Sequence, residues 1–169
     1  SYGHGTVFLH RALVESCDTF FYKMGLRLGV DRIARYADLL GLGRETGIEL
    51  PQEKTGLIPT RAWKKNLFRE EWQPGENLSV AVGQGAVLVT PLQNAVMVGQ
   101  VANGGWVIRP RLTKRVLSSG ETFEAAAEGE PIRELTEKRI PVAEEHFERI
   151  RKALEGVVAD PAGTAHGSR

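Results

Sequence analysis

The triplet Ser16-Cys17-Asp18 places a hydroxyl, a thiol and a carboxylate next to one another. A serine hydroxyl can act as a nucleophile or pass a proton between two other groups. An ionised carboxylate accepts hydrogen bonds but cannot donate them. The same residue types also cap helices, and capping is the more common reason for an isolated Ser-x-Asp triplet. The triplet alone therefore indicates a candidate proton-transfer site whose context must decide between chemistry and capping.

Cys17 is the only cysteine of the chain, so no internal disulfide can form. Its thiol has three interpretations: a small buried hydrophobic group, a nucleophile paired with His4 or His10, or a zinc ligand. The nucleophile interpretation lacks a recognisable orienting Asn or Asp and an oxyanion-hole motif. If the triplet is locally extended, Ser16 and Asp18 point to one side and Cys17 to the other, where its thiolate is free to bind a metal.

A junction between two predicted helices positions the triplet. The first helix begins after Thr6, which can cap it, and ends near Glu15. The second begins at a cap formed by Asp18 or Thr19 and stops at Gly29, because glycine readily adopts the left-handed conformation. Further helices are expected over the periodic apolar segments 31–40, 60–67, 91–102 and 142–159.

The remaining segments are predicted to be loops and short strands. Residues 46–59 form a connecting loop punctuated by prolines, and 106–108 and 112–117 are predicted strands before a turn at 118–120. Residues 125–130 are expected to be an exposed link.

Gly99 lies inside the predicted helix 91–102, where a glycine costs about 1 kcal/mol of helix stability relative to alanine, so close packing of another segment is expected there.

Composition excludes several classes of protein. The 169 residues are 41% hydrophobic and 25% charged, which is typical of one globular domain. A net charge of +1 offers no field that would gather nucleic acid. The longest apolar stretch, 78–89, is shorter than the roughly 20 residues of a membrane helix. The chain begins with Ser1 and ends in a glycine-rich loop, so we expect 1–169 to be a partial domain truncated at both ends.

Several strings of residues carry a resemblance to a known family. They are Glu15-Ser16-Cys17-Asp18-Thr19-Phe20-Phe21-Tyr22, Val82-Gly83-Gln84-Gly85, Val89-Thr90-Pro91-Leu92-Gln93 and Ala102-Asn103-Gly104-Gly105. In this order and spacing the chain resembles the transpeptidase domain of class B penicillin-binding proteins. Within that class it more closely resembles the elongation-type penicillin-binding protein 2. The strings that carry this likeness are Gly3-His4-Gly5, the Ser-Cys-Asp triplet with Thr19-Phe20-Phe21-Tyr22, Thr46-Gly47-Ile48 and Pro59-Thr60-Arg61-Ala62-Trp63-Lys64.

The resemblance implies an α+β fold of the penicillin-binding protein and serine β-lactamase type, here a mostly helical piece with a few antiparallel strands. It also implies a D,D-transpeptidase that cross-links peptidoglycan stem peptides through a serine acyl-enzyme and is acylated by β-lactams. The family uses the motifs Ser-x-x-Lys, Ser-x-Asn or its Asp variant, and Lys-Thr/Ser-Gly. Ser16-Cys17-Asp18 matches the second, which gives Ser16 the role of a proton relay. Asp18 would then hold a lysine ammonium or a substrate N–H.

The other two motifs are not matched in this chain. No Ser-x-x-Lys occurs, so the nucleophile is expected upstream of Ser1 and the isolated piece is expected to be inactive. Lys54-Thr55-Gly56 spells the third motif, but it follows Asp18 too soon and lies between prolines, so we interpret it as a loop. In the family the true motif follows a Gly-Thr-Ala segment, which here is Gly163-Thr164-Ala165.

No cofactor is expected for catalysis, but the resemblance points to a structural zinc site in the parent protein. Some similar family members hold zinc through a His and a Cys at the separation of His4 and Cys17, together with two Asp residues further upstream. Those Asp ligands would precede Ser1. We therefore expect zinc in the parent protein, and weak or no binding by this piece.

The resemblance further implies a parent anchored in the bacterial inner membrane, with this domain in the periplasm and a membrane glycan polymerase of the elongation machinery as partner. Two other functions stay open. One is a penicillin-binding sensor or scaffold of the same fold without turnover, which fold resemblance cannot exclude. The other is a β-lactamase-like hydrolase, for which we find no water-activating base.

Overall fold

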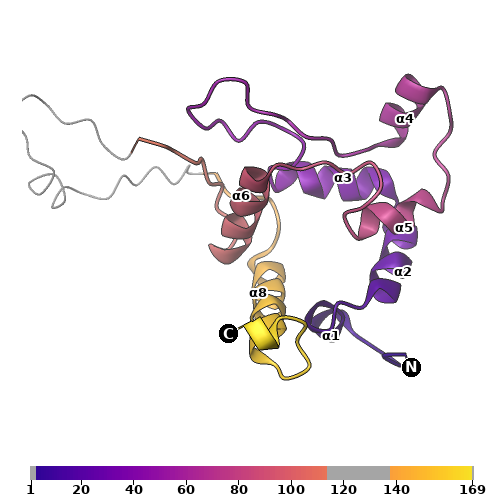
Figure 1. The fold of residues 1–169 in the computed structure, drawn as a ribbon, viewed down its shortest axis with the longest axis vertical. Helices are drawn as coiled ribbons and strands as arrows, with labels where there is room; N and C mark the ends of the chain where they lie inside the picture. Colours follow the sequence, from indigo (N-terminus) through magenta and orange to yellow (C-terminus); the bar gives the residue numbers. More distant parts are fainter. Residues whose placement is uncertain (1–2, 114–137, 169) are drawn as a thin grey trace, which may run out of the picture.

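The computed structural model describes residues 3–113 and 138–168, and helices dominate this part of the chain (Figure 1). In chain order they are α1 (Leu9–Val14), α2 (Asp18–Leu28), α3 (Val30–Leu39), α4 (Arg61–Phe68), α5 (Glu76–Ala81), α6 (Pro91–Ala102), α8 (Glu144–Ala159) and the 3₁₀ helix η1 (His166–Ser168). The mostly helical character predicted from the sequence is confirmed.

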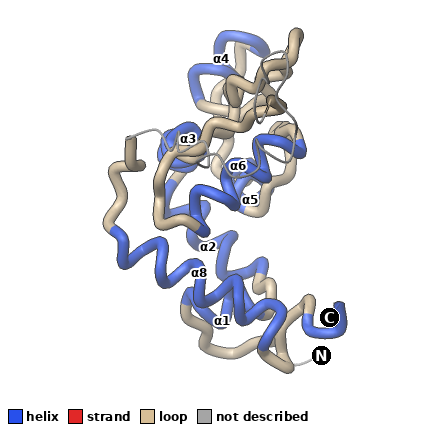
Figure 2. The backbone as a smooth tube through the Cα atoms, turned by 90° about the vertical axis from the view of Figure 1, so that its left-hand side faces the viewer, coloured by secondary structure: helices blue, strands red, loops and turns tan. Residues whose placement is uncertain are grey.

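The helices form two sides joined at the top and bottom of the molecule. One side holds α6 above α8, and the other holds α2, α4 and α5 (Figure 1). Helix α1 packs on α8 at the bottom, and α2 packs on α5. Both termini lie at the bottom beside α1 (Figure 2). The end of the chain therefore returns to the junction between α1 and α2.

Two threonines begin helices as the sequence predicts. Thr60 Oγ1 accepts a hydrogen bond of 3.0 Å from the Trp63 N–H at the start of α4. Thr90 Oγ1 accepts one of 3.1 Å from the Gln93 N–H, and Gln93 Oε1 accepts one of 2.9 Å from the Thr90 N–H. This reciprocal pair is a capping box, and Pro91 follows it at the first helical position.

Two predicted helix starts are wrong. Helix α1 begins after Phe8, which makes no side-chain capping bond, so Thr6 is not its cap. Asp18 is the first residue of α2 and follows Cys17, so neither Asp18 nor Thr19 caps this helix. The carboxylate of Asp18 still lies where the helix dipole favours a negative charge. At the other end, Gly29 stops α2 with a φ of 73°, as predicted.

The predicted strand at 106–108 is reduced to one antiparallel bridge between Trp106 and Arg139. A second isolated bridge joins Leu57 to Leu88, and the described ranges contain no longer strand. Two backbone hydrogen bonds flank the bridge at Trp106, from the Val107 N–H to the Lys138 carbonyl oxygen at 3.0 Å and from the Ile140 N–H to that of Gly105 at 2.8 Å, and the residues that would face 108 lie outside the described ranges. The predicted strand at 112–117 lies mostly outside the described residues, as do the turn at 118–120 and the link at 125–130.

A small hydrophobic core connects α6 to α8. Its buried members are Val101, Ile140 and Phe147. A Cβ atom on Gly105 would lie only 2.5 Å from the Phe147 ring, so the chain after α6 passes directly over this ring. Gly99 shows the predicted close packing, since a Cβ atom there would lie 2.7 Å from Ile108 Cδ1.

Two buried glutamines fasten α6 to the loops before it. Gln93 Nε2 donates hydrogen bonds to the carbonyl oxygens of Arg44, at 2.6 Å, and Thr55, at 2.9 Å. Gln100 Nε2 donates one of 2.8 Å to the Leu40 carbonyl oxygen. Buried polar groups are costly unless they are paired, so these bonds specify the path of the loops.

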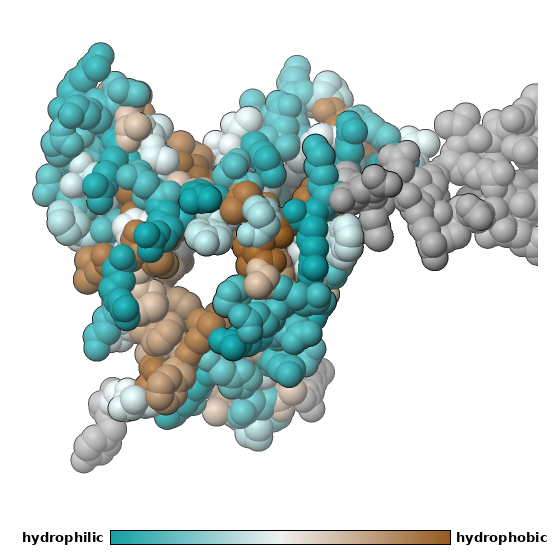
Figure 3. Space-filling view, turned by 180° about the vertical axis from the view of Figure 1, so that it is seen from behind, coloured by the Kyte–Doolittle hydropathy of each residue, from teal (hydrophilic) through white to brown (hydrophobic). Residues whose placement is uncertain are grey.

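Hydrophobic atoms also lie along the edges of an opening between the two sides of the molecule (Figure 3). Large hydrophobic side chains are exposed on both sides, including Leu26 on α2, Val98 on α6 and Leu154 on α8. Among the described helices, none is both long enough and apolar enough to cross a membrane.

Candidate active site

Ser16 lies in the turn that joins α1 to α2. Its φ is 49°, in the left-handed region that residues other than glycine seldom adopt. Hydrogen bonds from the Cys17 N–H to the Ala12 carbonyl oxygen, at 2.8 Å, and from the Ser16 N–H to that of Leu13, at 3.3 Å, hold the turn. The Ser16 side chain is exposed to solvent, as a residue that meets a substrate must be.

The triplet is not extended, so the condition under which strand alternation would separate its side chains is not met. Ser16 is left-handed, Cys17 has φ and ψ of −80° and 88°, and Asp18 is already helical. The three side chains nevertheless have different surroundings. Ser16 and Asp18 are exposed at the same turn, whereas Cys17 is only 6% exposed. A sharp turn, rather than strand alternation, separates the thiol from the hydroxyl.

Thr164 brings a second hydroxyl to Ser16. The Ser16 Oγ and Thr164 Oγ1 atoms are 3.2 Å apart, although 148 positions separate the residues in the chain. The Thr164 N–H donates a hydrogen bond of 3.2 Å to the carbonyl oxygen of Val14, the last residue of α1. In the sequence the Gly-Thr-Ala string indicates only where the later Lys-Thr/Ser-Gly motif is to be expected. No local pattern predicts so distant a contact.

The end of α8 fixes the position of Thr164. Gly163 donates its N–H to the Asp160 carbonyl oxygen at 2.8 Å, and Ala165 donates to that of Val157 at 3.0 Å. A Cβ atom on Gly163 would lie 2.3 Å from the Val157 carbonyl oxygen, so only glycine allows this approach. The threonine is thus held from both sides by backbone bonds to α1 and α8.

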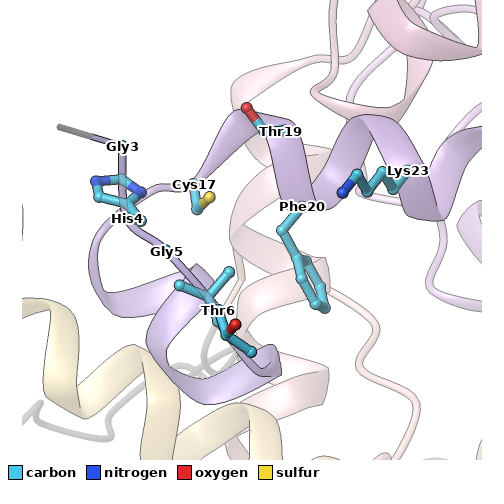
Figure 4. A pocket seen from close by; sticks show the side chains of 9 residues that line it. Gly3, His4, Gly5, Thr6, Cys17, Thr19, Phe20 and Lys23 are labelled. Atoms are coloured by element: carbon cyan, nitrogen blue, oxygen red, sulfur yellow. The ribbon is translucent and has the colours of Figure 1, made fainter. Parts of the chain in front are cut away.

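His4 and Cys17 line one pocket of about 700 Å³ beside α2 (Figure 4). Phe20 and Lys23 of α2 also line this pocket. His10, the other histidine considered as a partner of Cys17, lies on α1 against Gly156 of α8. The structure therefore brings His4, rather than His10, to the pocket of the thiol.

Glu15 gives the His4 imidazole an anionic neighbour. The Arg11 Nε donates a 2.6 Å hydrogen bond to Glu15 Oε1, and this bond holds the pKa of the Glu15 carboxyl below its usual 4.5. Glu15 is therefore ionised near neutral pH. Its Oε2 atom is 3.8 Å from His4 Nε2.

The described residues offer only part of a metal site. Within 3–113 and 138–168 no group of three or more His, Cys, Asp or Glu side chains is placed to hold a metal ion. Imidazole nitrogen and thiolate sulfur are nevertheless ligands that zinc prefers, and zinc in structural sites takes four. His4 and Cys17 thus fit half of a zinc ligand set.

The Lys54-Thr55-Gly56 string lies in a loop at the opposite end of the molecule from α1 (Figure 1). The Thr55 carbonyl oxygen accepts the bond from Gln93 of α6. Gly56 has a φ of 64°, and a Cβ atom on it would lie 2.3 Å from the Leu88 carbonyl oxygen. Tight packing of this loop on the start of α6 accounts for the glycine without any catalytic role.

Comparison with models of protein families identifies the family of this chain. The model described as "Penicillin binding protein transpeptidase domain" matches residues 1–169. The chain belongs to this family. This transpeptidase domain is 34% identical over 168 residues to the peptidoglycan D,D-transpeptidase MrdA of Escherichia coli strain K12. The alignment covers 98% of this chain and 25% of MrdA.

Solved structures agree with this assignment. One is the penicillin-binding protein PBP2 of Helicobacter pylori in its complex with MreC, which superimposes with a TM-score of 0.80 and 28% sequence identity. The match covers 98% of the transpeptidase domain and 28% of the Helicobacter pylori chain. A structure titled "Structural coordination of polymerization and crosslinking by a peptidoglycan synthase complex" matches 93% of the domain and 25% of its own chain, with 38% identity and a TM-score of 0.74. The domain thus spans about a quarter of these relatives. The resemblance to penicillin-binding protein 2, and the fold that it implies, are confirmed.

Proposed function

We propose that this chain is part of a peptidoglycan D,D-transpeptidase, which cross-links stem peptides through a serine acyl-enzyme and is acylated by β-lactams. The family membership and the similarity to MrdA along nearly the whole chain support this function. The observation that carries it is the exposed turn of Ser16 and Asp18, because a buried triplet could not meet a substrate. Two helices and the segment of Thr164 hold this turn in place.

In this mechanism Ser16 is a proton relay. The nucleophilic serine of the parent must lose a proton, and the amine that departs from the stem peptide must gain one. A hydroxyl can accept one proton while donating its own, so Ser16 can serve both groups without a net change in its protonation. Asp18 can only accept hydrogen bonds when ionised, which suits a lysine ammonium or a substrate N–H.

Replacing Ser16 in the full-length parent tests the proposal. Ser16→Ala should slow acylation by a fluorescent penicillin by about 10²–10⁴-fold, the usual contribution of a positioned acid–base group. Lys54→Ala is the matched control and should acylate at the wild-type rate, since Lys54 lies in the loop packed on α6. Circular dichroism should show both variants folded. An unchanged acylation rate in Ser16→Ala would remove Ser16 from the mechanism.

Turnover distinguishes the transpeptidase from its two rivals. The parent should join a donor stem peptide to an acceptor amine, which mass spectrometry of the product detects. A sensor or scaffold would be acylated by penicillin without forming this product. A β-lactamase-like hydrolase would release hydrolysed penicillin rapidly instead of keeping the acyl group.

We propose in addition that His4 and Cys17 help to hold a structural zinc in the parent, together with two carboxylates from outside this chain. The shared pocket and the ligand types of the two residues support the proposal. When bound, zinc would tie the segment of His4 to the turn that carries Ser16. Such a tie orients neighbouring groups and does not take part in proton transfer.

We propose that the parent is anchored in the bacterial inner membrane, exposes this domain to the periplasm and pairs with a glycan polymerase. The Helicobacter pylori relative forms a complex with MreC, and another similar chain belongs to a peptidoglycan synthase complex. The similarity to MrdA along nearly the whole chain supports this location. Co-purification of the tagged parent from detergent-solubilised membranes with a glycan polymerase is the expected result.

A further inference from the structure

The hydroxyls of Ser16 and Thr164 lie in contact, and a proton relay through Ser16 alone does not require the second hydroxyl. Their hydroxyl oxygens are 3.2 Å apart and both side chains are exposed, so neither is needed to fill a core. Either oxygen can be the donor in this hydrogen bond. The direction matters for a relay, because each hydroxyl has a single proton to donate.

Only one direction leaves Ser16 able to deliver its proton. If Ser16 donates to Thr164, its only proton is engaged in that bond and cannot pass to the departing amine. If Thr164 donates to Ser16, the Ser16 proton is free, and the oxygen receives a hydrogen bond at the moment when its own proton leaves. A hydrogen bond to an atom that gains negative charge becomes stronger as the charge develops.

The backbone around Thr164 is built to hold its hydroxyl at this place. The residue is bonded to the end of α1 through its N–H, and its neighbours Gly163 and Ala165 are bonded to the end of α8. The close approach of Gly163 to the Val157 carbonyl oxygen leaves the segment little room to shift. Thr164 is thus fixed before any substrate arrives.

We infer that Thr164 is a positioning residue for the relay serine: its hydroxyl donates a hydrogen bond to Ser16 Oγ and so directs the Ser16 proton toward the departing amine. The inference rests on the proposed function of Ser16. No group is transferred to Thr164, which keeps its own proton throughout the step. Its removal lowers the rate of acylation and leaves the non-covalent binding of the β-lactam unchanged.

The test uses the full-length parent and separates the acylation rate constant from the dissociation constant of the non-covalent complex by stopped-flow fluorescence. Thr164→Val keeps the shape and the backbone N–H but removes the hydroxyl, and should lower the acylation rate constant about three- to tenfold, as one net hydrogen bond predicts. Thr164→Ser keeps the hydroxyl and should restore most of the rate. Thr55→Val, the same change in the loop on α6, should have no effect. If Thr164→Val does not fold, Thr164→Ala removes the same hydroxyl and takes its place.

A double-mutant cycle distinguishes positioning from a general structural role. In a Ser16→Ala background, Thr164→Val should cause no further loss, because the group that it positions is already gone. An equal loss in both backgrounds, a wild-type rate in Thr164→Val, or no recovery in Thr164→Ser would each overturn the inference. A parent that penicillin does not acylate, or whose rate is unaffected by Ser16→Ala, would instead contradict the proposed function itself.

Discussion

At the scale of single residues, the backbone of Ser16 is the most unusual feature of the site. A left-handed conformation costs a residue with a Cβ atom roughly 1–2 kcal/mol, and only the surrounding structure can hold it. The closing bond from Cys17 to Ala12 and the hydroxyl of Thr164 supply that restraint. The strained residue is also the one to which the family's motif assigns proton transfer. Its left-handed backbone exposes the Ser16 hydroxyl at the turn.

The buried thiol beside Ser16 leads to a prediction about metal. Cys17→Ser in the parent should lower its thermal stability, and chelation of the wild type should lower it to a similar extent, because binding of a structural metal contributes directly to folding. Differential scanning fluorimetry with and without a chelator measures both effects. Metal analysis of the wild type should give close to one equivalent of zinc.

His4→Ala supplies the matched comparison, since His4 lines the same pocket as Cys17 but lies outside the Ser-x-Asp turn. It should lose zinc and stability as Cys17→Ser does. A parent that contains no zinc, and whose melting temperature a chelator leaves unchanged, would return Cys17 to a simple buried hydrophobic group.

At the scale of elements, the contact between α2 and α5 is set by a glycine. A Cβ atom on Gly25 would lie 2.6 Å from the Cβ of Ala81 and 2.7 Å from the carbonyl oxygen of Asn77. The two helices can therefore approach this closely only because Gly25 has no side chain. Since α2 begins at Asp18, this contact also orients the turn of Ser16.

Gly25→Ala should destabilise the parent by about 1–3 kcal/mol, the usual cost of overpacking against atoms that cannot move aside. Denaturant unfolding followed by circular dichroism measures the loss. Gly75→Ala is the control, because a Cβ atom there has open space and its φ of −63° suits any residue. This control should be neutral or slightly stabilising. Equal stability of Gly25→Ala and the wild type would show that α5 can slide away from α2.

A buried lysine joins α4 to α5 and predicts a dependence on pH. Lys64 Nζ is 2.7 Å from Glu76 Oε2. Desolvation opposes ionisation of Glu76, but the hydrogen bonds from Lys64 and from the Gln73 N–H outweigh it and hold the pKa of Glu76 below 4.5. A lowered carboxyl pKa gives stability that is fully present above the unfolded value and is lost as the pH falls through the folded value.

The variant Glu76→Gln should therefore melt below the wild type at pH 7, by less than the roughly 2–4 °C that 1 kcal/mol is worth in a domain of this size, because the Glu76 side chain is 37% exposed and solvent screens the pair. The difference should shrink as the pH is lowered from about 5 through the folded pKa, because the wild type then loses the same charge. Thermal melts across this range measure it. The exposed pair of Lys65 and Glu71, at 2.6 Å, is the control, and Glu71→Gln should change little at any pH. A constant gap between Glu76→Gln and the wild type would contradict the assignment.

The sequence predicted elements with strong local signals and missed those that depend on distant partners. The caps at Thr60 and Thr90 and the stop at Gly29 were correct, since each relies on a few adjacent residues. Helix α5 was missed because its six residues are too short for a periodic pattern and Gly75 makes no side-chain cap. The contact of Thr164 with Ser16 was missed because it forms only when the end of α8 returns to α1.

At the scale of the whole molecule, the described helices surround an opening and do not close into a compact globule (Figure 3). Hydrophobic atoms lie along the edges of the opening between its two sides (Figure 3). The chain spans about a quarter of the relatives that it matches, 25% of the Escherichia coli protein and 28% of the Helicobacter pylori chain. The turn of Ser16 joins α1 to α2, and the end of the chain, through α8 and Thr164, returns to pack against it. The proposed relay at this turn would need a Ser-x-x-Lys nucleophile, and no such motif occurs in these 169 residues.

The isolated chain should consequently form no covalent adduct with a labelled penicillin, whereas the full-length parent should form one. No serine in the 169 residues begins a Ser-x-x-Lys motif, and a serine without a lysine to deprotonate it reacts too slowly to compete with hydrolysis of the drug in solution. Intact mass spectrometry after incubation should show only the unmodified mass, and circular dichroism should confirm the helices. The same chain with Ser16→Ala serves as the control for any weak labelling. A stable adduct that Ser16→Ala abolishes would mean that Ser16 is itself the nucleophile, and the assignment of the Ser-x-Asp turn as a relay would then be wrong.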